Sequence, residues 1–264
     1  MNNQAVEPGQ LNRKRQVQVG ISQRIRLEWL EQTANLVLAG NDKCSINNAL
    51  QDLLKNEVSV GGEADRGSRE KIITILMKVW LNIPPGLEAF RIDGLKLLRS
   101  LPPRNRVVVH WGMVMAVYPF WGSVAGQVGR LLRLQESFTI SQIQRRLREQ
   151  FGERETVFRA ARRVIRSFVD WKVLRKTEAK GIYKQGEVIK ISEPRLAAWL
   201  IEAHFYANPE RKSTLSSLIN SPMLFPINLC AISIGQLGEY SERLEITKVD
   251  MDDFLVALHQ MGTR

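Results

Sequence analysis

Apolar residues recur at helical spacing through the first half of the chain and predict a bundle of about five helices over residues 22–121. Ser45 and Ser68 stand where the second and third helices would begin, and serine is a favoured N-cap. The third helix should end before Pro84, because the residue that precedes a proline is pushed out of the helical region. The other helices are expected at residues 22–39, at 87–101 and in the apolar stretch after Pro103.

One apolar stretch, residues 107–129, contains no Asp, Glu, Lys or Arg and is about as long as a membrane span. Pro119 stands in the middle of this stretch, and four glycines and His110 interrupt its apolar character. Proline and glycine punctuate the helices of soluble proteins in this way. We therefore expect a buried pair of core helices broken near Pro119, rather than a membrane span, and no membrane partner.

An amphipathic, arginine-rich segment follows. On a helical wheel of residues 155–171, the apolar residues fall within an arc of roughly 100° and four arginines share the opposite side. The preceding segment, 141–151, directs Arg145 and Arg148 away from its apolar side, and Gly152-Glu153-Arg154 supplies a short turn. Four arginines on one side form a strip that can lie along a groove and neutralise phosphates. The strip consists of Arg159, Arg162, Arg163 and Arg166.

Short β-like segments surround these two helices. Residues 137–139 are expected to form a strand after a supporting helix at 124–134, and residues 172–176 and 187–191 are expected to pair as a hairpin. A helix pair followed by a hairpin is typical of a winged helix-turn-helix, which we predict for residues 122–193. Side chains at the tip of such a wing are suited to contacting the DNA backbone or the minor groove. The residues expected at this tip are Lys180, Tyr183 and Lys184.

The last part of the chain, residues 194–264, is predicted to be mostly helical. A helix is expected after Pro194, a short helix near residues 214–219, a strand at 244–248 and a last helix at 251–259. The predicted fold class is therefore mainly α: an N-terminal helical bundle, then a winged helix-turn-helix with a small β-hairpin wing, and a short α/β C-terminal segment.

The charge of the chain indicates a polyanionic partner. Its 264 residues include 38 Lys and Arg and 27 Asp and Glu, which gives a net charge of +11 and a pI near 9.9. Residues 139–190 alone hold 14 Lys and Arg and 6 Asp and Glu, a net charge of +8. Residues 1–21 are expected to form a flexible basic arm and lack the apolar stretch of a secretory signal. Cys44 and Cys230 have no Cys or His at ligand spacing, which predicts neither a disulfide nor a zinc site and favours a reducing cytoplasm.

No catalytic centre is recognisable in the sequence. The three histidines are far apart and have no neighbouring cysteine or carboxylate pair, so structural roles are expected for them. Asp250, Asp252 and Asp253 precede apolar residues and suit the N-terminus of a helix better than a metal site. Gly61-Gly62 lacks the lysine and the strand context of a phosphate-binding loop. We therefore predict a non-enzymatic protein without metal or cofactor.

Taken together, these patterns predict binding of double-stranded DNA with low sequence specificity, because arginines grip phosphates at any sequence. RNA stays open as the alternative nucleic acid. A prediction from a different class is an assembly subunit that docks a larger enzyme through its wing and through Trp199, Phe205 and Tyr206. A transcriptional regulator is a third alternative, although no heptad seam supports the usual dimer. The residues predicted to contact DNA are Arg145, Arg148, Arg154, Arg159, Arg162, Arg163, Arg166, Lys180, Tyr183 and Lys184.

The layout also resembles that of the BrxA-like proteins of bacteriophage-exclusion (BREX) systems. Asn56 and the helix start at Arg66-Gly67-Ser68 are similar to the N-terminal region of that family, and a helical middle followed by a winged helix is similar to its architecture. The resemblance covers residues 25–192 by layout. It implies a small DNA-binding accessory subunit of a phage-defence operon, with other proteins of a defence complex as partners.

Overall fold

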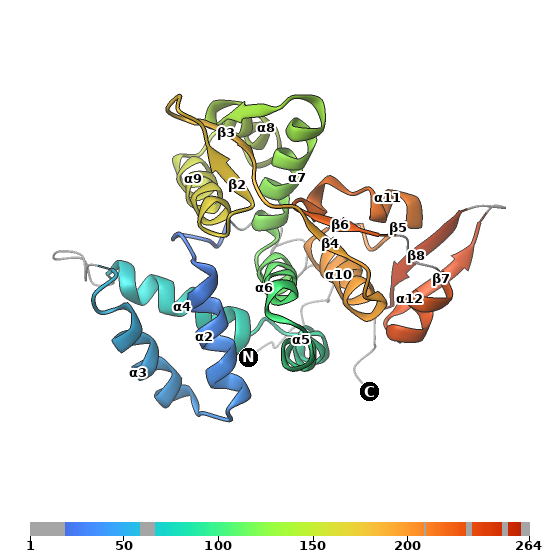
Figure 1. Ribbon diagram of the computed structural model, residues 1–264, viewed down its shortest axis with the longest axis horizontal. Helices are drawn as coiled ribbons and strands as arrows, with labels where there is room; N and C mark the ends of the chain where they lie inside the picture. The colour runs from blue at the N-terminus through green and yellow to red at the C-terminus, as the bar shows by residue number, and fades with distance from the viewer. Residues whose placement is uncertain (1–18, 59–66, 209, 231–233, 250–252, 260–264) are drawn as a thin grey trace, which may run out of the picture.

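Helix α6 runs through the centre of the protein in the computed structural model, and the other elements group around it (Figure 1). The structure describes residues 19–58, 67–208, 210–230, 234–249 and 253–259, and over these residues the protein is mainly helical. Residues 1–18 of the predicted basic arm, the loop at Gly61-Gly62 and Arg66 lie outside the described residues. The prediction that the arm extends to residue 21 was wrong, because Ile21 is buried in the core. The helices are α2 (Leu27–Leu38), α3 (Lys43–Leu54), α4 (Ser68–Trp80), α5 (Glu88–Ser100), α6 (Pro103–Val117), α7 (Pro119–Leu134), α8 (Ile140–Phe151), α9 (Glu155–Asp170), α10 (Pro194–Ala207), α11 (Leu215–Ile219), the 3-10 helix η1 (Pro222–Leu224) and α12 (Ile234–Tyr240). The strands are β1 (Ser137–Thr139), β2 (Leu174–Lys176), β3 (Ile182–Gln185), β4 (Ile189–Ile191), β5 (Lys212–Thr214), β6 (Ile227–Leu229), β7 (Leu244–Lys248) and β8 (Phe254–Leu258).

Three groups of elements surround α6. Helices α2, α3 and α4 lie on one side of it, and α10 with the C-terminal strands lies on the other (Figure 1). Helices α7, α8 and α9 and the strands β1 to β3 lie above it in the same view. We call this last group, residues 119–185, the α7–β3 module.

The apolar core centres on the contact between α6 and α10. Every residue of α6 from Val108 to Val117 is buried, and α10, which confirms the predicted helix after Pro194, is buried along most of its length. The two helices come close together because Gly112 has no Cβ: a Cβ there would lie 2.4 Å from the Trp199 ring. Trp199 also stacks on Phe90 of α5, with ring centroids 4.3 Å apart, and donates its indole N–H to the Phe90 carbonyl. Helix α10 therefore belongs to one continuous core with the N-terminal helices.

Helix α7 follows α6 after a sharp bend of 116°. Pro119 begins α7, so the predicted pair of core helices broken near Pro119 is confirmed. Most of α7 is also buried, against α6, α8 and α10. Among the described residues, no single helix is long and apolar enough for a membrane span, and only the bent pair of α6 and α7 taken together reaches that length and hydropathy.

Helix α2 begins at Leu27, later than the predicted start at Ser22. The residues before it are not helical, because α9 binds the backbone of Ile25. The Ile25 N–H donates to the Ser167 hydroxyl at 2.9 Å, and the Ile25 carbonyl accepts from the Trp171 indole at 3.0 Å. A contact between residues far apart in the sequence therefore overrides a local helical pattern.

The caps of α3 and α4 also differ from the predicted ones. The Asp42 carboxylate accepts from the N–H of Ser45 and of the residue before it, so Ser45 lies inside α3 and its prediction as the cap was wrong. Gly67 is the cap of α4, and Ser68 is the first residue of that helix. The predicted end of α4 before Pro84 is confirmed.

Helices α8 and α9 pack against a three-stranded antiparallel sheet with the order β1-β3-β2. The predicted strand 137–139 is confirmed as β1, but the predicted hairpin pairing was wrong, because β2 pairs with β3 and not with residues 187–191. Gly181, with φ of +82°, makes this tighter turn possible. Gly186 then passes so close to Lys172 that a Cβ would lie 2.1 Å from the Lys172 carbonyl. The strand β4 that follows pairs in parallel with β6 in a separate sheet.

The C-terminal segment contains more strand than the sequence predicted. The short helix near residues 214–219 and the strand at 244–248 are confirmed as α11 and β7. The predicted helix at 251–259 was wrong, because β8 occupies most of it and pairs with both β5 and β7. Val256 and Leu258 are buried and their neighbours are less so, which is the period of two that a short apolar run conceals.

Candidate nucleic-acid interface

Helices α8 and α9 form because their polar and apolar residues lie on opposite sides. A capping box begins α8: the Thr139 hydroxyl accepts from the Gln142 N–H, and the Gln142 side chain accepts from the Thr139 N–H. Gly152, with φ of +76°, ends α8 and opens the short turn that the sequence predicted. Helix α9 starts at Glu155, and its buried side holds the predicted apolar residues. The arginines are left on the side that faces solvent.

The four predicted arginines of α9 share this outer side. Arg159, Arg162 and Arg166 are exposed, and Arg163 is half-buried. Arg159 has an acidic partner, because its Nε donates to Glu155 Oε1 at 2.9 Å. Within the described part of the chain, the other three arginines form no ion pair. The outer side of α9 therefore carries positive charge that the described residues do not neutralise.

Burial and two neighbouring positive charges both act on the pKa of Arg163. Burial, together with the positive charges of Arg159 and Arg166, lowers the pKa of Arg163 below its ordinary value. An arginine stays protonated near neutral pH even so, because its ordinary pKa is above about 12. Like charges at this spacing repel one another, and an anion bound between them would relieve that repulsion. This side of α9 is therefore suited to a polyanion.

Three further predicted arginines lie on α8 and in the turn before α9. Arg145 is exposed and forms no ion pair with the described residues. Arg148 lies 3.3 Å from a carboxylate oxygen of Glu153 and 5.8 Å above the Phe158 ring. Arg154 donates its Nε to a backbone carbonyl at the end of α8, at 3.1 Å. Each of these guanidinium groups keeps N–H donors available for a ligand.

The hairpin of β2 and β3 places two of its three predicted contact residues on the surface. Lys180 is exposed in the turn, and Lys184 is exposed on the outer face of β3. The prediction that Tyr183 contacts DNA at the tip was wrong, because Tyr183 is only 7% exposed and stacks on Phe138 with ring centroids 5.8 Å apart. Side chains alternate between the two faces of a strand, so an outward Lys184 requires an inward Tyr183.

Two exposed cations of β2 were missed as contact residues by the sequence reasoning. Arg175 lies directly opposite Lys184 in the antiparallel register, and Lys176 follows it. The buried Leu174 was the available signal, because the residue after a buried strand residue points to the other face. Like charges opposite each other destabilise a hairpin, and a bound anion would offset that cost.

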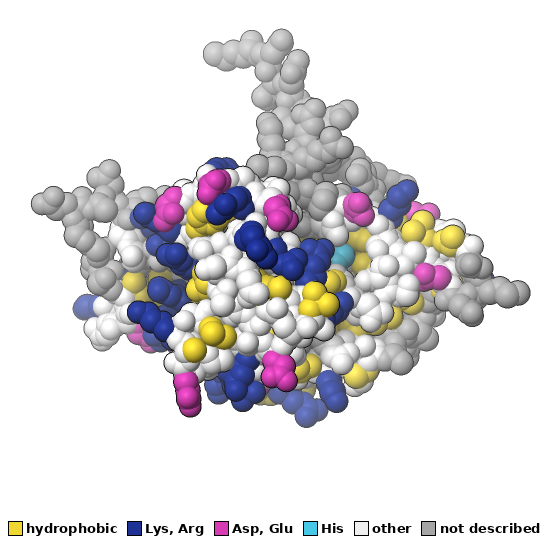
Figure 2. Space-filling model, turned by 90° about the horizontal axis from the view of Figure 1, so that it is seen from above, with side chains coloured by type: hydrophobic (Ala, Val, Ile, Leu, Met, Phe, Trp, Pro, Cys, Tyr) yellow, Lys and Arg dark blue, Asp and Glu magenta, His cyan; other side chains and the backbone are white. Residues whose placement is uncertain are grey.

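Figure 2 views this end of the protein from above. Lys and Arg side chains are spread across the face, and Asp and Glu side chains are fewer and more widely spaced. The exposed cations of the α7–β3 module form what we call the basic surface. Those that follow α7 are Arg145, Arg148, Arg154, Arg159, Arg162, Arg166, Lys172, Arg175, Lys176, Lys180 and Lys184.

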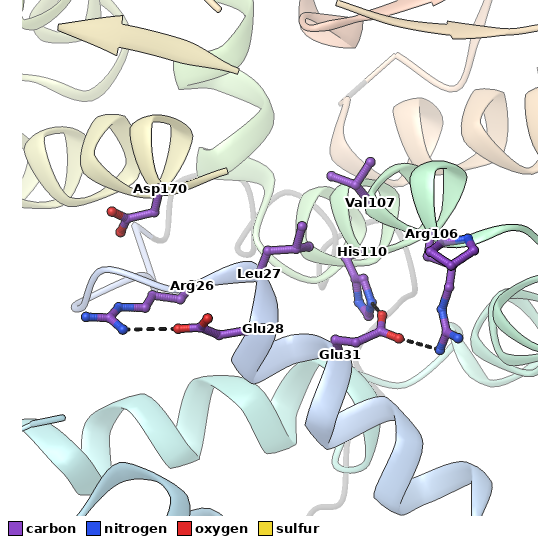
Figure 3. A pocket seen from close by; sticks show the side chains of 9 residues that line it. Arg26, Leu27, Glu28, Glu31, Arg106, Val107, His110 and Asp170 are labelled. Carbon is purple, nitrogen blue, oxygen red and sulfur yellow. Dashed lines mark hydrogen bonds and ion pairs between the residues drawn. The ribbon is translucent and has the colours of Figure 1, made fainter. Parts of the chain in front are cut away.

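The C-terminal end of α9 is anchored to the N-terminal helices. In addition to the hydrogen bonds of Ile25, Arg24 forms an ion pair with Asp170 at 3.1 Å. A pocket of about 580 Å³ opens beside this junction, between α2, α6 and the end of α9 (Figure 3). The C-terminal end of α9 therefore contacts the residues that precede α2, and the turn between α8 and α9 lies at its other end.

The charged groups of this pocket are already paired inside the protein. His110 Nε2 lies 2.6 Å from one carboxylate oxygen of Glu31, and Arg106 lies 2.6 Å from the other (Figure 3). Burial lowers the pKa of His110, and the Glu31 carboxylate only partly offsets it. Burial alone would raise the pKa of Glu31, but the hydrogen bond with His110 and the charge of Arg106 hold it below its ordinary value. These contacts of Glu31 therefore link α2 to α6.

A second buried histidine also has a structural partner. His204 Nε2 lies 2.9 Å from the Ser221 hydroxyl oxygen, and burial lowers the pKa of His204 to about 4. The Ser221 hydroxyl in turn accepts from the Met223 N–H and caps η1. Each buried histidine thus has a partner at Nε2, while its Nδ1 atom is buried without a hydrogen-bond partner among the described residues, so the structural role stays a prediction. His259 is exposed directly after β8.

Of the acidic cluster near residue 250, the structure describes only Asp253, and it does not begin a helix as predicted. Asp250 and Asp252 lie outside the described residues. Asp253 accepts from the Ser216 hydroxyl and from the N–H of Phe254, which begins a strand and not a helix. In the ranges that the structure describes, no group of three or more His, Cys, Asp or Glu side chains could hold a metal ion.

The aromatic residues of α10 are not available as a docking surface. Trp199 and Phe205 are buried, and Tyr206 is half-buried against Phe90. Trp199 and Tyr206 pack on Phe90 of α5 and Phe205 is buried in the core, so the expectation that these side chains form an exposed docking surface was wrong.

Comparison with known proteins yields no relative: no protein-family model, no curated protein and no solved structure matches this chain. The function is therefore argued from the chemistry of the basic surface.

Proposed function

We propose that residues 122–193 form a winged helix-turn-helix that binds double-stranded DNA. One observation carries the proposal: four arginines share the outer side of α9, and three of them have no acidic partner among the described residues. Helix α8, the short turn and α9 follow the order of a helix-turn-helix, and β2 with β3 stands beside them as a wing. An arginine-lined helix of this kind fits the phosphates that border a groove.

In this proposal α9 lies in the major groove, and the cations of the hairpin contact the neighbouring backbone. Arg162 and Arg166 would neutralise phosphates, while Arg175, Lys180 and Lys184 would hold the adjacent strand. Each phosphate that is neutralised releases condensed counterions, which makes the affinity depend steeply on salt. Since all sequences share the same phosphates, most of the binding free energy is independent of sequence.

The buried aromatic residues favour duplex DNA over single strands. Proteins that bind single-stranded DNA or RNA stack bases on exposed aromatic side chains. Within residues 119–185, which the structure describes throughout, Phe158 is half-buried and the other aromatic side chains are buried. The basic surface therefore offers charge and N–H donors without a stacking platform. The buried aromatic residues are Phe120, Trp121, Phe138, Phe151, Phe168, Trp171 and Tyr183.

A charge-reversal experiment tests the proposal. The double variant Arg162→Glu and Arg166→Glu should lower the affinity for a random-sequence duplex by about a hundredfold at low salt, because two attractive contacts become repulsive. Fluorescence anisotropy with a labelled duplex measures this affinity across a salt series. The matched control is Lys43→Glu with Lys55→Glu, which makes the same change in net charge on the exposed surface of α3.

The control separates a binding surface from the overall charge of the protein. We expect the α3 variant to bind duplex DNA nearly as well as the wild type, and both variants to keep the same circular dichroism spectrum. Equal losses in the two variants, or no loss in either, would contradict the assignment of α9. Parallel titrations with single-stranded DNA and RNA should give weaker binding, and tighter binding to either would contradict the preference for duplex DNA.

On the resemblance to BrxA-like proteins alone, we further propose that the DNA-binding protein serves phage defence as an accessory subunit. Deleting its gene from the source genome should raise the efficiency of phage plating, and the wild-type gene should restore protection while the Arg162→Glu and Arg166→Glu variant should not. Unchanged plating efficiency in the deletion strain would argue against this role.

A further inference from the structure

The guanidinium groups at the two ends of α9 differ in how they are held. Near its N-terminal end, Arg159 is tied to Glu155 through Nε, and Arg154 is tied to a backbone carbonyl through its own Nε. Farther along, Arg162 and Arg166 are exposed and make no hydrogen bond or ion pair with the described residues. The basic surface therefore has a restrained end, next to the turn, and an unrestrained remainder.

The restrained Arg159 retains the donors that match guanine. Glu155 engages Nε, so the two terminal nitrogens, Nη1 and Nη2, stay free and side by side. Guanine presents two neighbouring acceptors, O6 and N7, at its major-groove edge, and a bidentate arginine is the commonest specific contact to them. A side chain already held in place loses less conformational freedom on binding.

Resting on the proposed duplex binding, we propose that Arg159 reads a guanine in the major groove and that Glu155 is its positioning residue. The N-terminal residues of a recognition helix are those that contact base edges, and Arg159 lies near the N-terminus of α9. The arginines farther along the helix grip phosphates. Binding then depends in part on the DNA sequence, through one guanine contact. The amino-acid sequence alone predicted only low specificity.

The place of Glu155 supports this role. Glu155 and Arg159 are 63% and 67% exposed, and an exposed i,i+4 ion pair adds little to stability. A carboxylate on the surface that approaches DNA also repels phosphates and lowers affinity. Glu155 therefore has a cost for binding, and two benefits offset it: its carboxylate lies in the first turn of α9, where negative charge stabilises a helix, and it orients Arg159.

The readout is tested first with the wild-type protein. Selection from a random duplex library with the full-length chain should recover sites that share a guanine. Replacing that guanine by adenine should weaken binding roughly five- to a hundredfold. Replacing it by 7-deazaguanine, which removes the N7 acceptor and keeps the base pair, should weaken binding by part of that factor.

Three variants then separate recognition of the guanine base from contact with phosphates. Arg159→Lys keeps the charge but loses the two-pronged donor, so it should lose the preference for guanine and bind random duplex within a few-fold of wild type. Glu155→Ala should bind random duplex more tightly, because a repulsive charge is gone, and should still show a weaker preference for guanine. Arg99→Lys, at an exposed position of α5 outside the basic surface, is the matched control and should keep the full preference.

The decisive result is that Glu155→Ala should raise the affinity for random duplex and lower the preference for guanine. A purely electrostatic role of Glu155 would instead strengthen binding to all sites equally. A wild-type protein that binds duplex DNA but selects no guanine overturns the inference and leaves the proposed function intact. So does an Arg159→Lys variant that keeps the preference. A wild-type protein that binds no duplex at all instead contradicts the proposed function itself.

Discussion

Helices α6 and α9 have similar lengths but differ in how their apolar residues are distributed. From Val108 to Val117, α6 is buried on every side and is enclosed by α5, α7 and α10. Helix α9 buries one side and leaves Arg159, Arg162 and Arg166 exposed to solvent. A helix that is apolar all round must lie inside a core, whereas an amphipathic helix can serve a surface.

This difference separates stability from function in the molecule. The core around α6 and α10 supplies apolar burial, which is the main favourable contribution to folding. The outer arginines of α9 contribute little to folding, because they make few contacts within the protein. Substitutions in the two regions should therefore have separable effects on unfolding and on DNA binding.

The largest effect on stability is expected for Trp199→Ala in α10. Trp199 is buried, stacks on Phe90 and donates to its carbonyl, so its removal leaves a cavity and removes a buried hydrogen bond. The free energy of unfolding should fall by about 3–5 kcal/mol. Urea denaturation followed by circular dichroism measures the change.

Arg166→Ala is the matched test on α9. Its free energy of unfolding should stay within about 0.5 kcal/mol of the wild type, because Arg166 is exposed and has no partner among the described residues. Comparable losses of unfolding free energy in Trp199→Ala and Arg166→Ala would contradict the assignment of stability to the core and of DNA binding to the surface.

A pH dependence of stability is the next largest effect. The pKa of His204 is about 4 in the folded protein and near 6.5 in an unfolded chain, so between these values the unfolded chain binds a proton that the folded protein excludes. Stability should therefore fall as the pH drops from about 6.5 towards 4, by roughly 3 kcal/mol from this group. Burial of His110 acts in the same direction.

Urea midpoints of the wild type and of His204→Gln at pH 7 and pH 5 isolate the contribution of His204. We expect the wild type to lose more stability between the two pH values than the variant does. Equal losses would show that His204 does not exclude its proton in the folded protein. The arginines of α9 keep their charge throughout this range, so DNA binding should not follow the same pH profile.

A smaller effect is expected for Ser167→Ala, at the junction of the two regions. The Ser167 hydroxyl accepts from the buried N–H of Ile25, which would be left without a partner. The free energy of unfolding should fall by about 1–2 kcal/mol, and the Ile25 amide should exchange hydrogen faster. Duplex affinity should be unchanged, because Ser167 lies on the inner side of α9.

Ser141→Ala, at an exposed position of α8, is the control for this variant and should leave both quantities unchanged. A loss of duplex affinity in Ser167→Ala as large as that of the α9 charge reversal would show that the junction, and not the arginine strip, decides binding.

Local patterns predicted the helices of the α7–β3 module well and its strands less well. The amphipathic run of α9 and the turn at Gly152 were visible because the residues concerned are close in the sequence. The inward position of Tyr183 was not, because it depends on pairing of β3 with both β1 and β2. The outward Arg175 was missed although the apolar Leu174 before it was a local signal for its direction.

The caps and ends of elements elsewhere show the same limit. Ile25 fits a helical spacing, but hydrogen bonds to Ser167 and Trp171 hold its backbone outside the helix. The run Phe254–Leu258 is compatible with a helix, but pairing with β5 and β7 makes it a strand. A short apolar run does not reveal its own period.

By itself, the sequence determined which segments are apolar all round, which are amphipathic, and where four arginines share one side of a helix. These properties depend on the spacing of neighbouring residues, and the helical period converts that spacing into faces. Only the tertiary structure decided that α10 joins the core against α6, that β3 also pairs with β1, and that Glu31 meets His110. These contacts join residues far apart along the chain, and their free energy exists only once the chain has folded.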